Sequence, residues 1–194
     1  MTVGADPLAL TPELEGFRRQ FETLSADADV LVAPLSDEQF TWKPAPEAWS
    51  VAECVEHLNV TARLYLPALD EGIADAIRRG MYGEGPFAYG LVGRLAVRSM
   101  EPSPRFRVKA PKAFRPAAPR ARHEVMAVFR AYQVQYTDRL RQANGLDLAR
   151  ARIASPVVRW IRLPLGCGFA MMTAHERRHL AQARRVTDTA GFPR

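Results

Sequence analysis

The sequence predicts an all-α protein, a bundle of four long helices. Apolar residues recur every three or four positions through four long segments. No segment of comparable length alternates apolar and polar residues as a half-buried strand does. A chain of 194 residues is long enough for a sizeable core, so we expect a single domain over residues 1–194.

The first helix is expected to begin at Thr11, because Thr is a common N-cap and Pro12 suits the first turn. Pro34 marks its end. The apolar positions between them follow helical spacing: Leu14, Phe17, Phe21, Leu24, Ala28 and Leu31. Beyond this helix, the Ser-Asp-Glu-Gln stretch at residues 36–39 predicts a short helical turn.

The second helix is expected to start at Ser50, because Ser50 and Glu53 have the spacing of a capping box. It should continue towards Arg79. Two tryptophans, Trp42 and Trp49, flank the proline-containing stretch that precedes it. Since these prolines forbid a regular helix, the stretch is expected to be a loop pinned against the bundle.

Residues 80–119 are the least regular part of the chain. A short helix is expected over residues 87–100, between a glycine-rich start and a proline-rich end. We expect this insertion to cover one end of the bundle, where it either shapes specificity or serves as a structural wrap. The third long helix should run from about Arg120 to Asn144, and the fourth should start between residues 165 and 168.

The composition favours a cytoplasmic protein. No apolar run reaches the roughly 18 residues of a membrane span, and the first residues lack a signal-peptide pattern. The two cysteines, Cys54 and Cys167, are too few for a disulfide scaffold. The formal net charge is +6, but the arginines are spread along the chain among acids, without a nucleic-acid-binding motif. We therefore expect neither a membrane nor a nucleic acid as partner.

The strongest chemical signal is the segment His175-Glu176-Arg177-Arg178-His179. Residues four apart lie one above the other on a helix, so His175 and His179 can bind one metal ion. The same H-E-x-x-H pattern supplies two zinc ligands and a general base in metalloproteases. A protease of that kind takes its third ligand from further along the chain.

That downstream ligand is missing here. Arg185 stands six residues after His179, and Asp188 is the only acid in the remainder of the chain. A third metal ligand would therefore come from upstream, where the other two histidines are His57 and His123.

Four stretches at the two ends of the chain match known motifs in order and spacing: Leu35-Ser36-Asp37-Glu38-Gln39, Trp42-Lys43-Pro44-Ala45-Pro46, Trp49-Ser50-Val51-Ala52-Glu53-Cys54-Val55-Glu56-His57-Leu58, and His175-Glu176-Arg177-Arg178-His179-Leu180-Ala181-Gln182-Ala183-Arg184. Together they resemble the DinB-like superfamily of four-helix metalloproteins, in particular its second, larger subgroup. Residues 80–119 match none of its motifs.

The resemblance implies an antiparallel four-helix bundle with unusual connections, often assembled as a homodimer. Residues 80–119 would then be an irregular insertion between helices two and three. It also implies a divalent metal held by three histidines, which by position are His57, His175 and His179. Three imidazoles leave one coordination position open for water or substrate, as catalytic sites do. Imidazole suits zinc, nickel, iron or copper, of which we expect zinc or nickel.

Three neighbouring residues have two interpretations each. Glu176 points about 100° away from His175 around the helix, so it either pairs with arginines or acts as a catalytic base or ligand-orienting partner. Cys54 is either a buried inert thiol or a group that faces the site. Gln182 either donates to an oxygen on the metal or packs.

Two classes of function follow. The first is a metal-dependent enzyme acting on a small molecule, for which the resemblance implies hydrolysis, or transfer or isomerisation with a low-molecular-weight thiol. The second is a non-catalytic bundle that binds metal or ligand in a stress response, with Glu176 or Cys54 closing the site as a fourth ligand. A metal-free interaction module is a third, weaker alternative.

Overall fold

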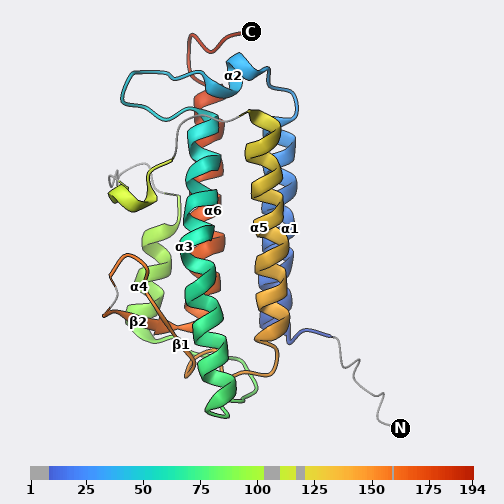
Figure 1. Ribbon diagram of the computed structural model, residues 1–194, viewed down its shortest axis with the longest axis vertical. Coiled ribbons are helices and arrows are strands. Elements are labelled where there is room, and N and C mark those ends of the chain that lie inside the picture. The colour runs from blue at the N-terminus through green and yellow to red at the C-terminus, as the bar shows by residue number, and fades with distance from the viewer. Residues whose placement is uncertain (1–8, 103–109, 117–120, 159) are drawn as a thin grey trace.

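The computed structural model describes residues 9–102, 110–116, 121–158 and 160–194. Its long helices are α1 (Pro12–Val32), α3 (Val51–Arg78), α5 (Arg122–Gln142) and α6 (Leu165–Thr187) (Figure 1). The shorter helical elements are α2 (Asp37–Thr41), α4 (Gly90–Met100) and the 3-10 helix η1 (Lys112–Phe114). The predicted all-α class is confirmed, with one addition: a two-stranded antiparallel sheet of β1 (Arg152–Ala154) and β2 (Arg162–Pro164).

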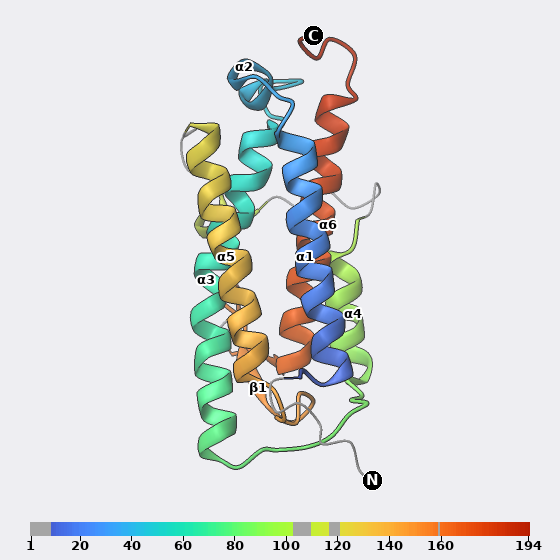
Figure 2. The same cartoon turned by 90° about the vertical axis from the view of Figure 1, so that its right-hand side faces the viewer.

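The four long helices run up, down, down and up in chain order. α1 and α6 point one way, and α3 and α5 point the other way (Figures 1 and 2). α3 packs against both α5 and α6, and α1 packs against the same two helices. α3 and α5 run in the same direction, so α5 begins at the same end of the bundle as α3 (Figures 1 and 2). None of the helices in the described ranges has the length and apolarity to cross a membrane.

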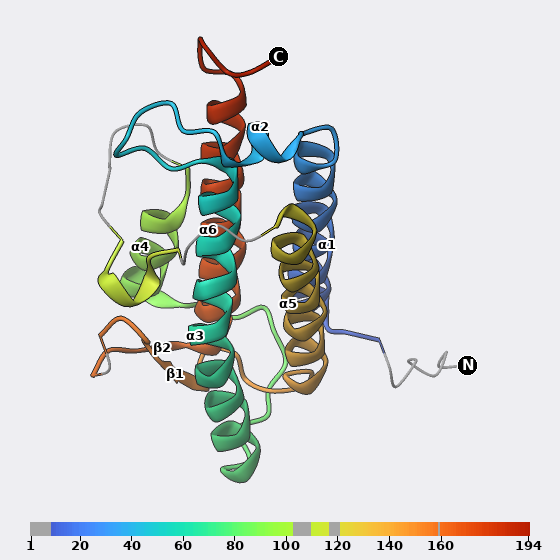
Figure 3. The same ribbon diagram turned by 45° about the horizontal axis from the view of Figure 1, so that its top comes forward.

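The described part of the insertion lies along the side of the bundle. α4 packs along α6, and η1 packs against α3 (Figure 3). A Cβ atom added at Gly93 of α4 would lie 2.6 Å from the Cys167 sulfur, and one added at Gly166 of α6 would lie 1.9 Å from the Tyr89 hydroxyl. The start of α4 and the start of α6 are therefore in close contact. The insertion was expected to cover one end of the bundle. Its described part instead lies along the sides of α6 and α3. α4 begins three residues later than predicted, at Gly90, whose φ of +66° turns the chain into the helix.

Local signals set the helix starts. Capping boxes form at Ser36 and Ser50, where each hydroxyl accepts a hydrogen bond from the amide three residues on, at 3.1 Å. Thr11 precedes α1 as predicted, but its side chain makes no cap hydrogen bond. Its backbone N–H instead donates to Asn144 Oδ1 at 3.0 Å, which ties the start of α1 to the loop after α5.

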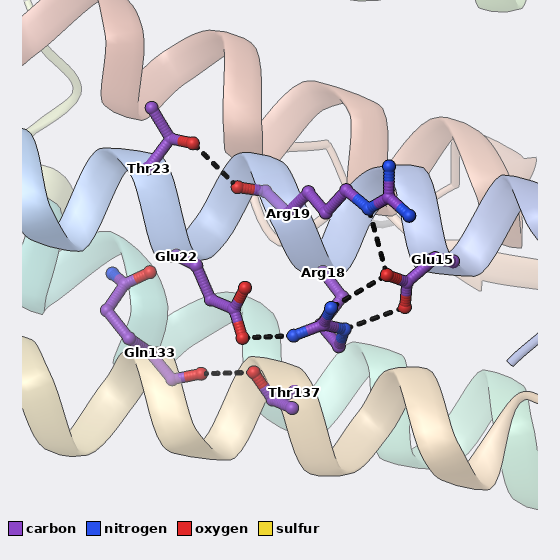
Figure 4. Close-up of polar contacts among 7 residues, drawn as sticks. All are labelled: Glu15, Arg18, Arg19, Glu22, Thr23, Gln133 and Thr137. Carbon is purple, nitrogen blue, oxygen red and sulfur yellow. Dashed lines mark hydrogen bonds and ion pairs between the residues drawn. The ribbon is translucent and has the colours of Figure 1, made fainter. Parts of the chain in front are cut away.

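The exposed face of α1 carries a short ladder of ion pairs (Figure 4). Arg18 pairs with Glu15 and Glu22, and Arg19 Nε lies 2.9 Å from Glu15. Such pairs stabilise a helix by only about 0.2–0.5 kcal/mol each. The bundle is therefore held mainly by its buried apolar stripes.

Two apolar clusters divide the bundle core along its length. One includes Phe21 and Met172, and the other includes Leu24 and Leu180. Buried polar side chains occupy the intervening level of the helices: Thr61, Gln133, Glu176 and His179. Polar groups at this depth need partners, so this level is where the fold positions its chemistry.

Candidate metal centre

Packing of α3 against α6 brings three histidines together. One nitrogen from each of His57, His175 and His179 lies within 4.8 Å of the other two. The Nε2 atoms of His57 and His175 are 3.2 Å apart. No other His, Cys, Asp or Glu in the described chain joins this set.

The backbone of η1 orients His57. Its Nδ1 lies 2.6 Å from the carbonyl oxygen of Phe114. A carbonyl can only accept, so Nδ1 carries the hydrogen and Nε2 keeps its lone pair on the side of His175. Phe114 is itself buried and packs edge-on against Tyr65, with ring centroids 6.4 Å apart, which holds the carbonyl in place.

Burial keeps the three imidazoles neutral. Desolvation lowers the pKa of His57, opposed by the Phe114 carbonyl. Desolvation, with smaller contributions from the neighbouring His57 and Arg178, lowers the pKa of His175 to about 3. Desolvation also lowers the pKa of His179, and the other two histidines add to that effect. Neutral imidazoles offer the lone pairs that a metal requires.

The donor set fits a divalent cation. His179 Nδ1 is buried, and within the described residues it has no hydrogen-bond partner. Buried polar atoms normally have one. Three neutral imidazoles at this spacing can coordinate zinc, nickel, iron or copper, which would satisfy lone pairs that otherwise face one another.

Trp49 forms an aromatic wall beside this centre. Its ring centroid is 4.9 Å from that of His57 and 5.7 Å from that of His179, where the two rings stack. Trp49 directly precedes Ser50, so the capping box that starts α3 also fixes the position of the wall. Trp42 packs elsewhere, edge-on against Phe192.

Glu176 faces α5 instead of an arginine. It is buried, and its Oε1 accepts a hydrogen bond from Gln133 Nε2 at 2.9 Å. Burial raises the pKa of this carboxyl to about 8, and Oε2 has no partner among the described residues. Within the described residues, Glu176 therefore bonds to Gln133 and does not form the ion pair with an arginine that was one of its two interpretations. A catalytic role for Glu176 stays a prediction.

The arginines between the two α6 histidines attach the insertion to α6. Arg177 Nη2 lies 2.5 Å from Glu101 Oε1, just beyond the end of α4. Arg178 Nη1 donates to the carbonyl oxygen of Ser99 at 2.8 Å. The insertion is thus fixed close to the histidines at both α4 and η1.

The remaining candidates lie outside the three-histidine set. Cys54 is buried in an apolar cluster, and this burial raises the pKa of its thiol, as expected of an inert cysteine. His123 is exposed at the start of α5. Gln182 is half-buried on α6, and its side chain opposes the lowering of the His179 pKa.

Sequence reasoning missed three partners of the site: the Phe114 carbonyl, the Trp49 ring and Gln133. Only Gln133 left a usable signal, because it is a polar residue on the inward stripe between Phe129 and Tyr136. The contacts of His57 with the Phe114 carbonyl and of His179 with the Trp49 ring join segments far apart in the chain, which local patterns do not encode.

Comparison with known proteins agrees with this geometry. The family model described as DinB superfamily matches residues 20–183, from the first half of α1 to near the end of α6. No curated protein and no solved structure shows a significant match. Since the family match covers most of the chain, the protein belongs to the DinB superfamily.

Proposed function

We propose that the protein binds one divalent metal ion through His57, His175 and His179, and that it is a metal-dependent enzyme acting on a small molecule. The observation that carries the proposal is the convergence of three neutral imidazoles, one nitrogen of each within 4.8 Å of the others. Zinc or nickel is the expected metal.

The number of ligands favours catalysis over a purely structural role. The two residues that would close the site, Cys54 and Glu176, are not members of the set. Structural zinc sites usually have four protein ligands, whereas catalytic ones have three and an open position. A divalent cation held there supplies Lewis acidity to an oxygen or sulfur atom of a substrate.

The chain's own groups prepare this position. The Phe114 carbonyl fixes the tautomer of His57, and Trp49 covers the imidazoles of His57 and His179 with an apolar ring. Both effects hold the nitrogen donors in a defined orientation and restrict the approach of water from that side. We propose hydrolysis, or transfer or isomerisation with a low-molecular-weight thiol, as the reaction class.

A turnover screen tests the enzyme proposal. Protein stripped with a chelator and reloaded with zinc or nickel is assayed on small ester, amide and thiol-acceptor substrates, with and without a low-molecular-weight thiol. Turnover is expected in reloaded wild type and in His123→Ala, which alters an exposed histidine, but not in His179→Ala. Bound metal without turnover across the screen would argue for a non-catalytic bundle.

Glu176→Gln tests the predicted base separately. The substituted amide keeps an oxygen that can accept from Gln133, but it cannot exchange a proton as the carboxyl can near its raised pKa of about 8. A general base typically contributes about 10²–10⁴-fold to the rate. A loss of that size with unchanged metal content would support the catalytic role, and unchanged turnover would assign Glu176 to packing alone.

A further inference from the structure

Exposed apolar side chains gather on α4. Leu91 and Val92 are 72% and 73% exposed, and Leu95 is 54% exposed. A second group lies at the tip of the hairpin between β1 and β2, where Trp160 is 86% exposed and Val157 and Ile161 are also exposed. Single exposed apolar residues are common, but two groups of them on one side of a molecule indicate an interaction surface. We call these residues together the α4–hairpin surface.

The two groups belong to one side of the molecule. In Figures 1 and 3, α4 and the β1–β2 hairpin both lie on the same side of α3 and α6. β2 continues directly into α6. The first turn of α6 contacts the start of α4 through the pairs Gly166–Tyr89 and Cys167–Gly93.

This surface is cationic as well as apolar. Residues 85–100 and 148–175 contain arginines but no Asp or Glu. Four of the exposed arginines lie on α4, β1 and β2 themselves, and none of the four forms an ion pair within the described chain: Arg94, Arg98, Arg152 and Arg162. On the bundle helices, by contrast, Arg19 pairs with Glu15 and Arg130 pairs with Asp29.

Three acids close to this surface have partners of their own. Glu101 pairs with Arg177, and Glu13 accepts a hydrogen bond from the Tyr89 hydroxyl. Asp147 accepts from the backbone amides of residues 149 and 150. The arginines of the surface therefore keep their charge available for an anionic partner.

A shallow hollow opens on the same surface. It encloses about 520 Å³ between α4 and α6. Leu91, Leu95, Val97 and Ala170 contribute apolar lining. The charged residues that line it are Arg94, Arg98 and Glu101, of which Glu101 pairs with Arg177. Apolar lining beside guanidinium groups matches the acyl and headgroup parts of a lipid.

We propose that the α4–hairpin surface docks the protein on an anionic lipid bilayer. Trp160 and the exposed aliphatic residues enter the headgroup region, and the four arginines contact anionic headgroups. Docking of this kind needs no membrane-spanning run, so the proposal departs from the expectation that no membrane is a partner, which rested on the absence of such a run. It is independent of the metal centre.

Two other partners fit the surface less well. A second copy related by twofold symmetry would present the same patch, which would bring the unpaired arginines of both copies together. A nucleic acid would use the arginines, but its phosphate backbone gains nothing from exposed Leu91, Val92 and Leu95. An anionic lipid bilayer can interact favourably with both the apolar and the cationic groups.

Vesicle cosedimentation of the full chain tests the proposal. Vesicles of phosphatidylcholine alone are compared with vesicles that also contain phosphatidylglycerol, at low and high salt. Wild type should bind the anionic vesicles and be released by salt, because salt screens exposed charges. Arg94→Glu with Arg98→Glu should weaken binding at least about tenfold. The control, Arg19→Glu with Arg141→Glu, changes the net charge by the same amount, but its substitutions lie on α1 and α5. It should bind like wild type.

Tryptophan fluorescence tests whether the tip of the β1–β2 hairpin contacts the vesicle. Anionic vesicles should shift the tryptophan emission of wild type to shorter wavelength, and Trp160→Phe should still bind but lose most of that shift. Absence of wild-type binding, or equal loss in both charge-reversal variants, would overturn the proposal. So would a wild-type dimer in light scattering that becomes a monomer in Arg94→Glu with Arg98→Glu, because the surface would then join two copies.

Discussion

At the residue scale, the geometry of the candidate centre depends on how each imidazole is held. His57 is fixed through its Nδ1 by a backbone carbonyl, a group that no side-chain substitution removes. His175 and His179 are positioned by their spacing on α6. The Trp49 ring packs against the rings of His57 and His179 and so restricts both of them. A metal entering this set would therefore meet donors that are already oriented, which reduces the ordering that binding requires.

The position of Trp49 predicts a spectroscopic signal. In a protein that carries Trp42→Phe and Trp160→Phe, Trp49 is the remaining tryptophan. Addition of Co²⁺ or Ni²⁺ should quench its emission up to equimolar metal, because a paramagnetic ion between the imidazoles would lie close to the indole. The same titration of His179→Ala should show little quenching. Quenching of equal size in both proteins would place the metal elsewhere.

The two thiols should be unreactive in the folded protein. Burial raises the pKa of Cys54 and raises that of Cys167 to about 11, so at pH 8 almost no thiolate forms, and both sulfurs are shielded. A thiol reagent at pH 8 should modify neither cysteine in native protein, with or without chelator, and both in denaturant. Fast labelling of Cys54 after metal removal alone would show that it is a ligand.

At the element scale, α3 and α6 position the centre, and the hairpin braces both helices. Ile153 of β1 contacts α3 at Gly72 and α6 at Gly168, where added Cβ atoms would lie 2.8 Å and 2.6 Å from its side chain. A Cβ at Gly72 would also lie 2.7 Å from the carbonyl oxygen of Arg152. Glycine at these two positions allows the strand to approach the helices closely.

This contact predicts opposite effects for two glycine substitutions. Gly72→Ala should lower the free energy of unfolding by about 1–3 kcal/mol, because the strand backbone would have to move. Gly16→Ala should raise it by about 0.5–1 kcal/mol, because the α1 position is open and Ala favours a helix. Urea denaturation measures both, and a loss of stability in both variants would contradict the packing described.

At the scale of the whole molecule, features encoded locally were predictable. The four long helices, the short helical turn at residues 36–39 and the capping box at Ser50 follow from residue spacing within a single turn or stripe. The His175–His179 pair follows from the same periodicity. The third histidine, His57, required the family resemblance, because the residues alone left His57 and His123 open.

Features that depend on distant contacts were not predictable in the same way. The β1–β2 pairing spans three residues a strand, too few for alternation to be visible, and it is stabilised by packing on α3. The flank formed by α4 depends on the parallel course of α3 and α5, which no local pattern specifies. The single-domain, homodimer and cytoplasmic assignments stay predictions.

The central claim is that His57, His175 and His179 bind one metal ion. Its most direct test is elemental mass spectrometry of untagged wild type, of the three single alanine variants and of His123→Ala, with circular dichroism to confirm the fold. Near-stoichiometric zinc or nickel is expected in wild type and in His123→Ala, and loss of the metal in the other three. Metal retained in those three variants, or absent from metal-replete wild type, would contradict the three-histidine centre.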